Sequence, residues 1–195
     1  MMKNKIIGIL SFLIVLSACT PKQPLDSERG WNTLFENVHT FTYDGDADWT
    51  NNKDQICNIL GSGNGFLITN KKYNSFQLEF EFKPDAIVNS GIFIRCKAAE
   101  MSPVDCYELN IWDEHPDQSN RTGSIVHLST ASKTVNTIGL WNTMRVIAKG
   151  NRIQIWINDI QTMNYEEAVS RAGVIGFQAF EEGQICFRNT RIKGM

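Results

Sequence analysis

The sequence predicts an all-β fold, an antiparallel sandwich or barrel, from three observations. Apolar residues recur with a period of two, as in the run Phe76–Phe82, where four apolar residues alternate with polar ones until Pro84. Runs of this kind are separated by turns rich in glycine and asparagine. One short segment, 165–171, has the pattern of a helix. Many short strands with close turns and almost no helix are typical of a sandwich or a barrel.

The chain begins with a segment that predicts export. Lys3 and Lys5 precede an apolar run, 6–16, which is about half as long as the ~20 residues that a membrane-spanning helix needs. The residues Leu16-Ser17-Ala18-Cys19 then resemble a bacterial lipobox. In lipoproteins the signal peptide is cut before this cysteine, which then carries the lipid. The alternatives are an ordinary signal peptide with a chance cysteine, or a hydrophobic N-terminal strand.

We therefore expect three parts in the chain. Residues 1–18 are predicted to be a signal peptide, residues 19–30 a tether lipidated at Cys19, and residues 31–195 one domain. The tether is polar and contains two prolines, which suits a spacer. The mature protein is then expected to be anchored by lipid in the bacterial cell envelope, at the outer membrane. The sequence leaves open whether it faces the periplasm or the cell surface.

Within the domain, the second clear alternation is at 152–158, where three isoleucines alternate with larger polar or aromatic residues. Other segments have strand-like composition and are bounded by turn signals. These further strands are expected at Gly65–Thr69, Gly91–Lys97, Tyr107–Trp112, Gly123–Leu128, Trp141–Lys149, Val174–Phe180 and Ile185–Lys193.

The charge of the chain argues against a nucleic-acid partner. Without Lys3 and Lys5, 17 basic residues face 21 acidic ones, so the mature chain has a formal charge of −4. Binding to phosphates needs clustered lysine and arginine side chains, and the sequence shows no such cluster.

Four cysteines remain once Cys19 is assigned to lipid. An exported protein lies outside the reducing cytosol, so disulfides are permitted. Cys96 ends one expected strand and Cys106 begins the next, so a bridge between them would close the connecting loop and contribute about 2–3 kcal/mol. The sequence leaves the pairing open, including that of Cys57 and Cys186. No Cys-x-x-Cys spacing is present, which argues against a cysteine-based metal site.

Alternation also indicates which side chains could bind a ligand. In the strand 107–112, Tyr107, Leu109 and Ile111 are expected in the core, which leaves the polar and aromatic side chains on the opposite face. In 91–96, Ile92, Ile94 and Cys96 are likewise expected inward. The opposite faces then carry Glu108, Asn110, Trp112, Phe93 and Arg95.

Gln154 and Trp156 of the strand 152–158 would extend this face into a polar and aromatic floor. Acids, amides, an arginine and flat tryptophans suit a sugar, because hydroxyls need donors and acceptors and the C–H face of a sugar packs on aromatic rings. We therefore expect Asn110, Trp112, Gln154 and Trp156 to bind a carbohydrate. The alternative is structural: Arg95 and Glu108 form a cross-strand ion pair, and the tryptophans pack on the sheets.

The loop 113–117, Asp-Glu-His-Pro-Asp, is dense in groups that carry chemistry. A general base or a metal ligand would be well placed at the end of a strand. Asp113 and His115 are therefore candidate ligands of a divalent metal, whose identity the sequence does not give. The alternative is an acidic turn fixed by Pro116.

Several segments together resemble the 3-keto-disaccharide hydrolase domain, in order and over nearly the whole mature chain, about 31–193. The resemblance rests on Asn89–Arg95, Tyr107–Asp117, Gly123–Ile125, Trp141–Thr143, Lys149–Ile153, Trp156–Asp159, Gly173–Gln178 and Phe187–Ile192. It implies a two-sheet jelly roll of the concanavalin A-like lectin/glucanase type. It also implies a hydrolase that cleaves glycosides already oxidised to a ketone at sugar carbon 3.

This implied chemistry gives roles to the candidate residues. A C3 ketone acidifies the C2 proton, so a base can remove it while a donor stabilises the enolate, and the C1 substituent leaves before water adds back. By analogy, Glu108 or His115 acts as base or acid. Arg95 is assigned to the enolate or a hydroxyl, and Asp113 orients the site or binds a metal. These four residues are our candidate catalytic set.

The sequence departs from the usual family pattern at three places. The opening is Leu34-Phe35-Glu36-Asn37 instead of Leu-Phe-Asn-Gly, Asn110 stands where a glutamine is usual, and Asn158-Asp159 replaces an Asn-Gly turn. An aspartate at a turn can still adopt positive φ, so we expect the fold to be kept. The alternative functions are a non-catalytic glycan-binding lipoprotein on the same fold, or a structural partner of an oxidoreductase or transporter.

Overall fold

The computed structural model describes residues 29–35, 41–52, 55–97, 101–180 and 182–195. The predicted signal peptide, the lipidation site Cys19 and most of the predicted tether lie outside these residues. Within them, no helix is both long and apolar enough to cross a membrane.

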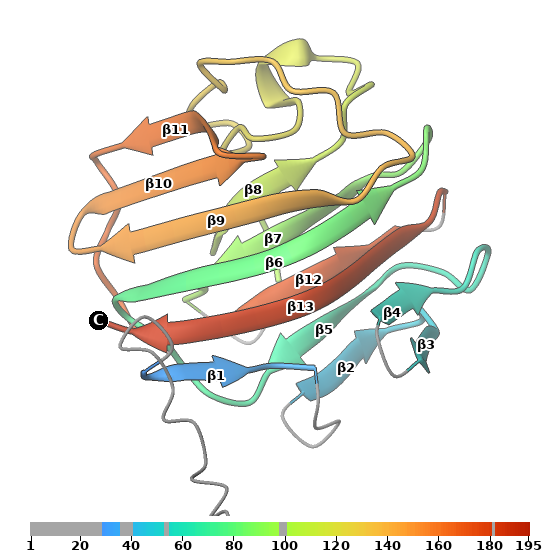
Figure 1. Ribbon diagram of the computed structural model, residues 1–195, viewed down its shortest axis with the longest axis horizontal. Helices are drawn as coiled ribbons and strands as arrows, with labels where there is room; N and C mark the ends of the chain where they lie inside the picture. Colours follow the sequence, from blue (N-terminus) through green and yellow to red (C-terminus); the bar gives the residue numbers. More distant parts are fainter. Residues whose placement is uncertain (1–28, 36–40, 53–54, 98–100, 181) are drawn as a thin grey trace, which may run out of the picture.

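Two antiparallel sheets pack against each other (Figure 1). Sheet A contains β11 (Ile160–Tyr165), β10 (Arg152–Ile157), β9 (Asn142–Lys149), β6 (Phe76–Pro84), β13 (Ile185–Gly194), β4 (Gln55–Asn58) and β3 (Trp49–Asn52), in that spatial order, and β1 (Trp31–Thr33) also pairs with β13. Sheet B contains, again in spatial order, β2 (Phe41–Gly45), β5 (Gly65–Thr69), β12 (Gly176–Ala179), β7 (Ser90–Ile94) and β8 (Tyr107–Ile111). The predicted two-sheet antiparallel sandwich is therefore confirmed.

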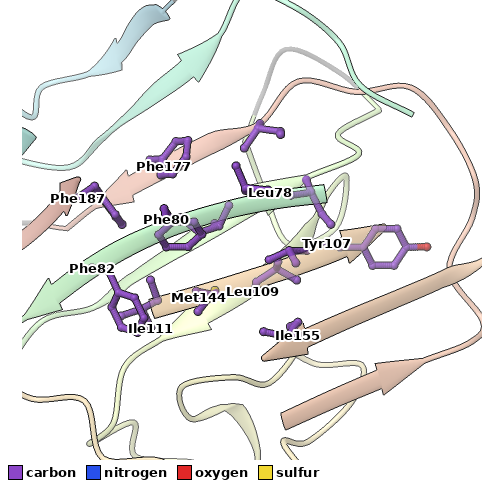
Figure 2. Packing of buried hydrophobic residues seen from close by; sticks show 14 of the residues in the cluster. Leu78, Phe80, Phe82, Tyr107, Leu109, Ile111, Met144, Ile155, Phe177 and Phe187 are labelled. Carbon is purple, nitrogen blue, oxygen red and sulfur yellow. The ribbon is translucent and has the colours of Figure 1, made fainter. Parts of the chain in front are cut away.

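The core lies between the sheets and is formed by the inward-facing side chains of the longer strands, such as β6, β9 and β10, in which buried residues alternate with more exposed ones (Figure 2). Phe80 of β6 meets Phe177 of β12 and Phe187 of β13 edge to face, at centroid distances of 5.8 and 6.0 Å. Leu109 and Ile111 of β8 are fully buried in the same cluster, as their alternation predicts. Burial of a large apolar side chain contributes about 1.5–3 kcal/mol, so this layer is the main source of stability.

The sequence missed several strands and predicted one helix that does not form. Strands β1 to β4 and β11 were not expected. The hairpin between β10 and β11 turns at Asn158 and Asp159, which both adopt positive φ, 49° and 63°. Segment 123–128 forms isolated bridges beside β8 and not a strand. Residues 166–171 are irregular, because their backbone groups are bonded elsewhere: Ala168 N–H donates to Asn151 O.

Two disulfides join neighbouring segments. Cys96 is bonded to Cys106, as the sequence suggests, and Cys57 of β4 is bonded to Cys186 of β13. The second bridge spans 129 residues of sequence, so on the chain-entropy account it is the stronger stabiliser, at roughly 4–5 kcal/mol against about 3 kcal/mol for the short loop.

Candidate active site on the outer face of sheet B

The outer face of sheet B, which points away from the core, collects polar side chains of β8 next to two glycines. Glu108 lies opposite Phe93 of β7, and Asn110 lies opposite Gly91. Phe93 in turn lies opposite Gly176 of β12. The core-facing residues alternate with these, and neighbouring side chains extend over the two glycines, Glu108 over Gly91 and Met101 over Gly176.

Glu108 is buried without a partner. Glu108 is only 8% exposed, yet no donor among the described residues is hydrogen-bonded to its carboxylate. Burial raises the pKa of Glu108 to about 7, because a carboxylate without compensating bonds is disfavoured away from water. A Cβ at Gly91 would lie 3.3 Å from Glu108 Oε1 and from Glu108 Cγ. The absence of a side chain at Gly91 therefore makes the space into which the carboxylate extends.

Gln178 of β12 is a second unpartnered group on this face. The pairing of Phe177 with Ile92, continued by one residue, brings Gln178 next to Gly91, and Ser90 Oγ donates to Gln178 O over 2.7 Å. Gln178 is 9% exposed, and its Oε1 is buried without a hydrogen bond. The sequence analysis assigned Gln178 no role. The available signal was a polar residue alternating with Phe177 and Ala179 in an otherwise apolar strand.

Apolar groups form one wall of this face. Phe66 and Phe93 meet edge to face at 5.1 Å, and the Cys96–Cys106 disulfide packs with Phe93 in the same small cluster. Met101 covers Gly176, since a Cβ there would lie 2.9 Å from Met101 Sδ. These contacts reduce the access of water on one side of Glu108.

The loop that follows β8 is held by hydrogen bonds and a ring contact within itself. His115 Nδ1 accepts from Asp117 N–H over 3.0 Å, and the His115 ring contacts Trp112 edge to face at 4.5 Å. The Gln118 amide donates to the carbonyl oxygens of Asp113 and His115. This fixes His115 and Trp112 beyond the end of β8, and no hydrogen bond or ion pair joins His115 to Glu108 in the described part of the chain.

Two of the predicted site residues are engaged in structural bonds. Asp113 accepts from Thr137 N–H over 2.6 Å at one oxygen and from Thr137 Oγ1 over 3.0 Å at the other. The Asn110 amide donates to Asn120 O and accepts from Ile111 N–H. Both carboxylate oxygens of Asp113 are therefore occupied, and the described residues contain no group of three side chains suited to a metal.

Arg95 does not lie beside Glu108, which corrects our prediction. Arg95 adopts a left-handed φ of 54°, so the alternation of β7 ends before it. Its fully buried guanidinium donates to three backbone carbonyls, those of Asn74, Gly150 and Val169. The same break places Cys96 in the outer cluster with Phe93, and not in the core where we expected it.

Gln154 and Trp156 are also apart from Glu108, since they belong to β10 in sheet A. Both alternate with isoleucines that enter the core, so they lie on the outer face of sheet A. Trp156 there packs under the guanidinium of Arg145 at 4.6 Å. The single floor predicted from sequence is in fact divided between the two sides of the sandwich.

Comparison with known proteins decides the family. A family model described as the 3-keto-α-glucoside-1,2-lyase-like domain matches residues 30–193. The chain belongs to this family. No curated protein sequence matches the chain.

Solved structures share the fold. A proposed glycosyl hydrolase from Parabacteroides distasonis ATCC 8503 superposes with a TM-score of 0.76 at 21% identity, over 85% of this chain and 99% of that one. The carbohydrate-binding module CBM66 from Bacillus subtilis gives 0.58 at 14% identity, over 85% and 96%. The carbohydrate recognition domain of Emp46p gives 0.60 at 9% identity, over 84% and 96%. These likenesses confirm the jelly-roll architecture of this carbohydrate-related family.

Proposed function

We propose that this domain cleaves 3-keto-glycosides on the outer face of sheet B, with Glu108 as the base. The observation that carries the proposal is the state of Glu108: it is buried, lacks a hydrogen-bond partner among the described residues, and has a pKa raised to about 7. A general base works best when its pKa lies near the working pH. The family description, a 1,2-lyase-like domain, names an elimination across the two carbons where such a base would act.

The proposed reaction begins with a substrate whose C3 is already a ketone. The Glu108 carboxylate takes the proton from C2, and the electron pair of that C–H bond is held as an enolate on the C3 oxygen. Collapse of the enolate forms the C1=C2 double bond and breaks the bond from C1 to the aglycone oxygen. That oxygen leaves with a proton, returned by the protonated Glu108 or supplied by His115. Addition of water across the double bond then completes the hydrolysis.

Gln178 is the group that we assign to substrate binding beside Glu108. Its amide makes no hydrogen bond to the rest of the described chain, and a buried amide without partners costs about 1–3 kcal/mol. A sugar hydroxyl or the C3 oxygen would satisfy it. Asn110, with its amide bonded within the protein, orders the loop beyond β8, and Trp112 remains available as a face for the sugar ring.

We further propose that the domain is held at the cell envelope by a lipid on Cys19, downstream of a signal peptide at 1–18. The two disulfides support an oxidising location. Mass spectrometry of the processed chain tests this: the first residue should be a lipidated Cys19, and C19S should release the protein from membranes. An unprocessed N-terminus would contradict it.

Replacement of Glu108 by glutamine is the decisive test of the catalytic proposal. With a 3-keto-glucoside that releases a chromogenic aglycone, E108Q should lower kcat by about 10²–10⁴ because the base is lost. The matched control is E167Q, a change of the same kind at an exposed position of the chain. Full activity in E108Q would refute the role of Glu108. Wild-type protein that binds 3-keto-glucosides but releases no aglycone would refute the enzymatic proposal.

The second candidate function is glycan binding without cleavage. It is favoured by the shared fold of CBM66 and the Emp46p recognition domain, which are described as carbohydrate-binding. Under this alternative, E108Q and the wild type should bind glycosides with similar affinity, and unoxidised glycosides should bind as well as their 3-keto forms. Calorimetry with both forms of one glycoside distinguishes the two functions.

A further inference from the structure

The outer face of sheet A carries three arginines, each stacked on a tryptophan. Arg188 lies over Trp141 at 4.0 Å and Arg191 lies over Trp31 at 4.6 Å. The third pair is Arg145 of β9 over Trp156 of β10, also at 4.6 Å. In Figure 1 the central strands of this sheet, β9, β6 and β13, lie side by side at the front. The repetition allows the three sites to be compared directly.

Two of the three arginines also hold a carboxylate. Arg188 binds Glu81 through Nε and Nη2 at 2.7 and 2.6 Å. Arg191 binds Glu79 through the same two nitrogens at 3.0 and 2.8 Å. A guanidinium that is oriented on one face by an aromatic ring presents its Nε and Nη2 edge to a carboxylate, and in both pairs these two nitrogens contact the same oxygen, Oε2. Each of these two sites is therefore complete within the chain.

Arg145 has the tryptophan but no carboxylate. It lies opposite Glu79 in the sheet, yet both oxygens of Glu79 are occupied, one by Arg191 and the other by the Gln77 amide at 2.7 Å. Within the described part of the chain, Arg145 makes no hydrogen bond or ion pair, and its Nε is buried without a partner. Arg145 is thus an oriented cation that lacks its anion.

Arg145 also lines a depression large enough for a ligand. Its volume is about 560 Å³, within the range of roughly 300–1,000 Å³ that is usual for small-molecule sites. The charges of Glu79 and Arg191 in its wall neutralise each other. Further polar side chains around the depression could bind hydroxyls, and these are Thr33, Thr143, Asp159 and Asn189.

We propose that this depression is a second carbohydrate site, which binds a uronic acid residue through its carboxylate on Arg145. The ligand carboxylate would pair with Arg145 as Glu81 pairs with Arg188 and Glu79 pairs with Arg191. The surrounding hydroxyl-binding groups favour a carboxylated sugar over a carboxylate without hydroxyls. The site lies on the opposite side of the sandwich from Glu108, so it binds its ligand independently of cleavage.

The test uses two probes that differ in one group, methyl α-glucuronide and methyl α-glucoside. The full chain should bind the glucuronide by calorimetry and the glucoside at least about tenfold more weakly, since a hydrogen-bonded charge is lost. R145Q should abolish this preference, while R145K should retain part of it because the charge remains without the fork. D159N should tighten glucuronide binding, because it removes a negative charge from the rim.

Two controls show whether the preference for the glucuronide comes from Arg145. R152Q removes an exposed arginine of the same sheet, paired with Glu166, and should leave glucuronide binding unchanged. E108Q should also leave it unchanged, so failure of the proposed catalysis and failure of this site are distinguishable. Equal affinity of the wild type for both probes, or an unchanged preference in correctly folded R145Q, would overturn the proposal. Thermal unfolding of R145Q establishes that the variant is folded.

Discussion

The two outer faces of the sandwich carry glutamates in opposite electrostatic states. On sheet A, burial raises the pKa of Glu81, but hydrogen bonds from Asn189 and Arg188, together with the Arg188 charge, outweigh it, so the pKa is lowered. On sheet B, Glu108 is buried and receives no hydrogen bond or nearby positive charge among the described residues, so its pKa is raised to about 7. The residue type is the same, but Glu81 is partly buried and bonded to Arg188 and Asn189, whereas Glu108 is buried and has no such partner among the described residues.

Hydrogen-bond partners therefore separate structural from reactive carboxylates in this fold. A paired glutamate such as Glu81 is held in its charged form and contributes to the sheet. An unpaired buried glutamate is costly, and a fold retains such a group most readily where a ligand or a reaction uses it. Asp113 shows the same contrast. It is as buried as Glu108, but Thr137 donates hydrogen bonds to both of its carboxylate oxygens, and we therefore assign it a structural role.

The largest effect on stability is expected from Arg95, which lies away from the candidate site. R95M should lower the free energy of unfolding by at least about 3 kcal/mol, because a fully buried guanidinium and its bonds to three backbone carbonyls are lost together. R152M, at an exposed surface pair, should cost under about 1 kcal/mol. Urea denaturation measures both. A stable R95M that loses catalysis would instead return Arg95 to the active site.

The next effect tests the contrast between the two glutamates through pH. Glu108 has a folded-state pKa of about 7 against an ordinary value of 4.5. Between these two pH values the folded state therefore binds more protons than the unfolded state. The free energy of unfolding of the wild type should fall as pH rises from 4.5 to 7. E108Q should remove this loss and be more stable than wild type at pH 8, by up to about 3 kcal/mol.

E81Q should behave in the opposite way. Because the folded-state pKa of Glu81 is lowered, its contribution is present above its unfolded-state pKa and is lost as pH falls through the folded one. The pair is partly exposed, so the change should be under about 1 kcal/mol. Denaturation at pH 5 and pH 8 of both variants checks the signs. An E108Q curve parallel to that of the wild type would mean that Glu108 is not perturbed.

The last effect concerns activity alone and comes from Gly91. G91A adds a Cβ 3.3 Å from the Glu108 carboxylate, so the side chain must move by a few tenths of an ångström. We expect kcat/KM for a 3-keto-glucoside to fall about tenfold, since small misplacements of a catalytic group are costly, with little change in the unfolding midpoint. Unchanged activity would show that the space above Gly91 is not used.

The period-two pattern allowed the sandwich and the core faces of β6, β8 and β10 to be predicted, because each side chain is assigned to a face by local geometry alone. The same rule placed Glu108 outside the core correctly. It failed at Arg95, where a left-handed residue ends the alternation, and at the predicted helix 165–171, whose backbone bonds to distant partners such as Asn151 and Tyr107.

The fold class, the positions of most long strands along the chain and the presence of Glu108 on an outer face could all be predicted from the sequence, since they depend on local periodicity and on residues that resemble a family. Which faces meet is a property of the tertiary structure. Tertiary packing divided Gln154 and Trp156 from Glu108, brought Gln178 next to Gly91, and left Arg145 without the carboxylate that its neighbours have. These relations depend on strand order across two sheets and on hydrogen bonds between residues as far apart as Glu79 and Arg191, 112 positions along the chain, which local pattern does not encode.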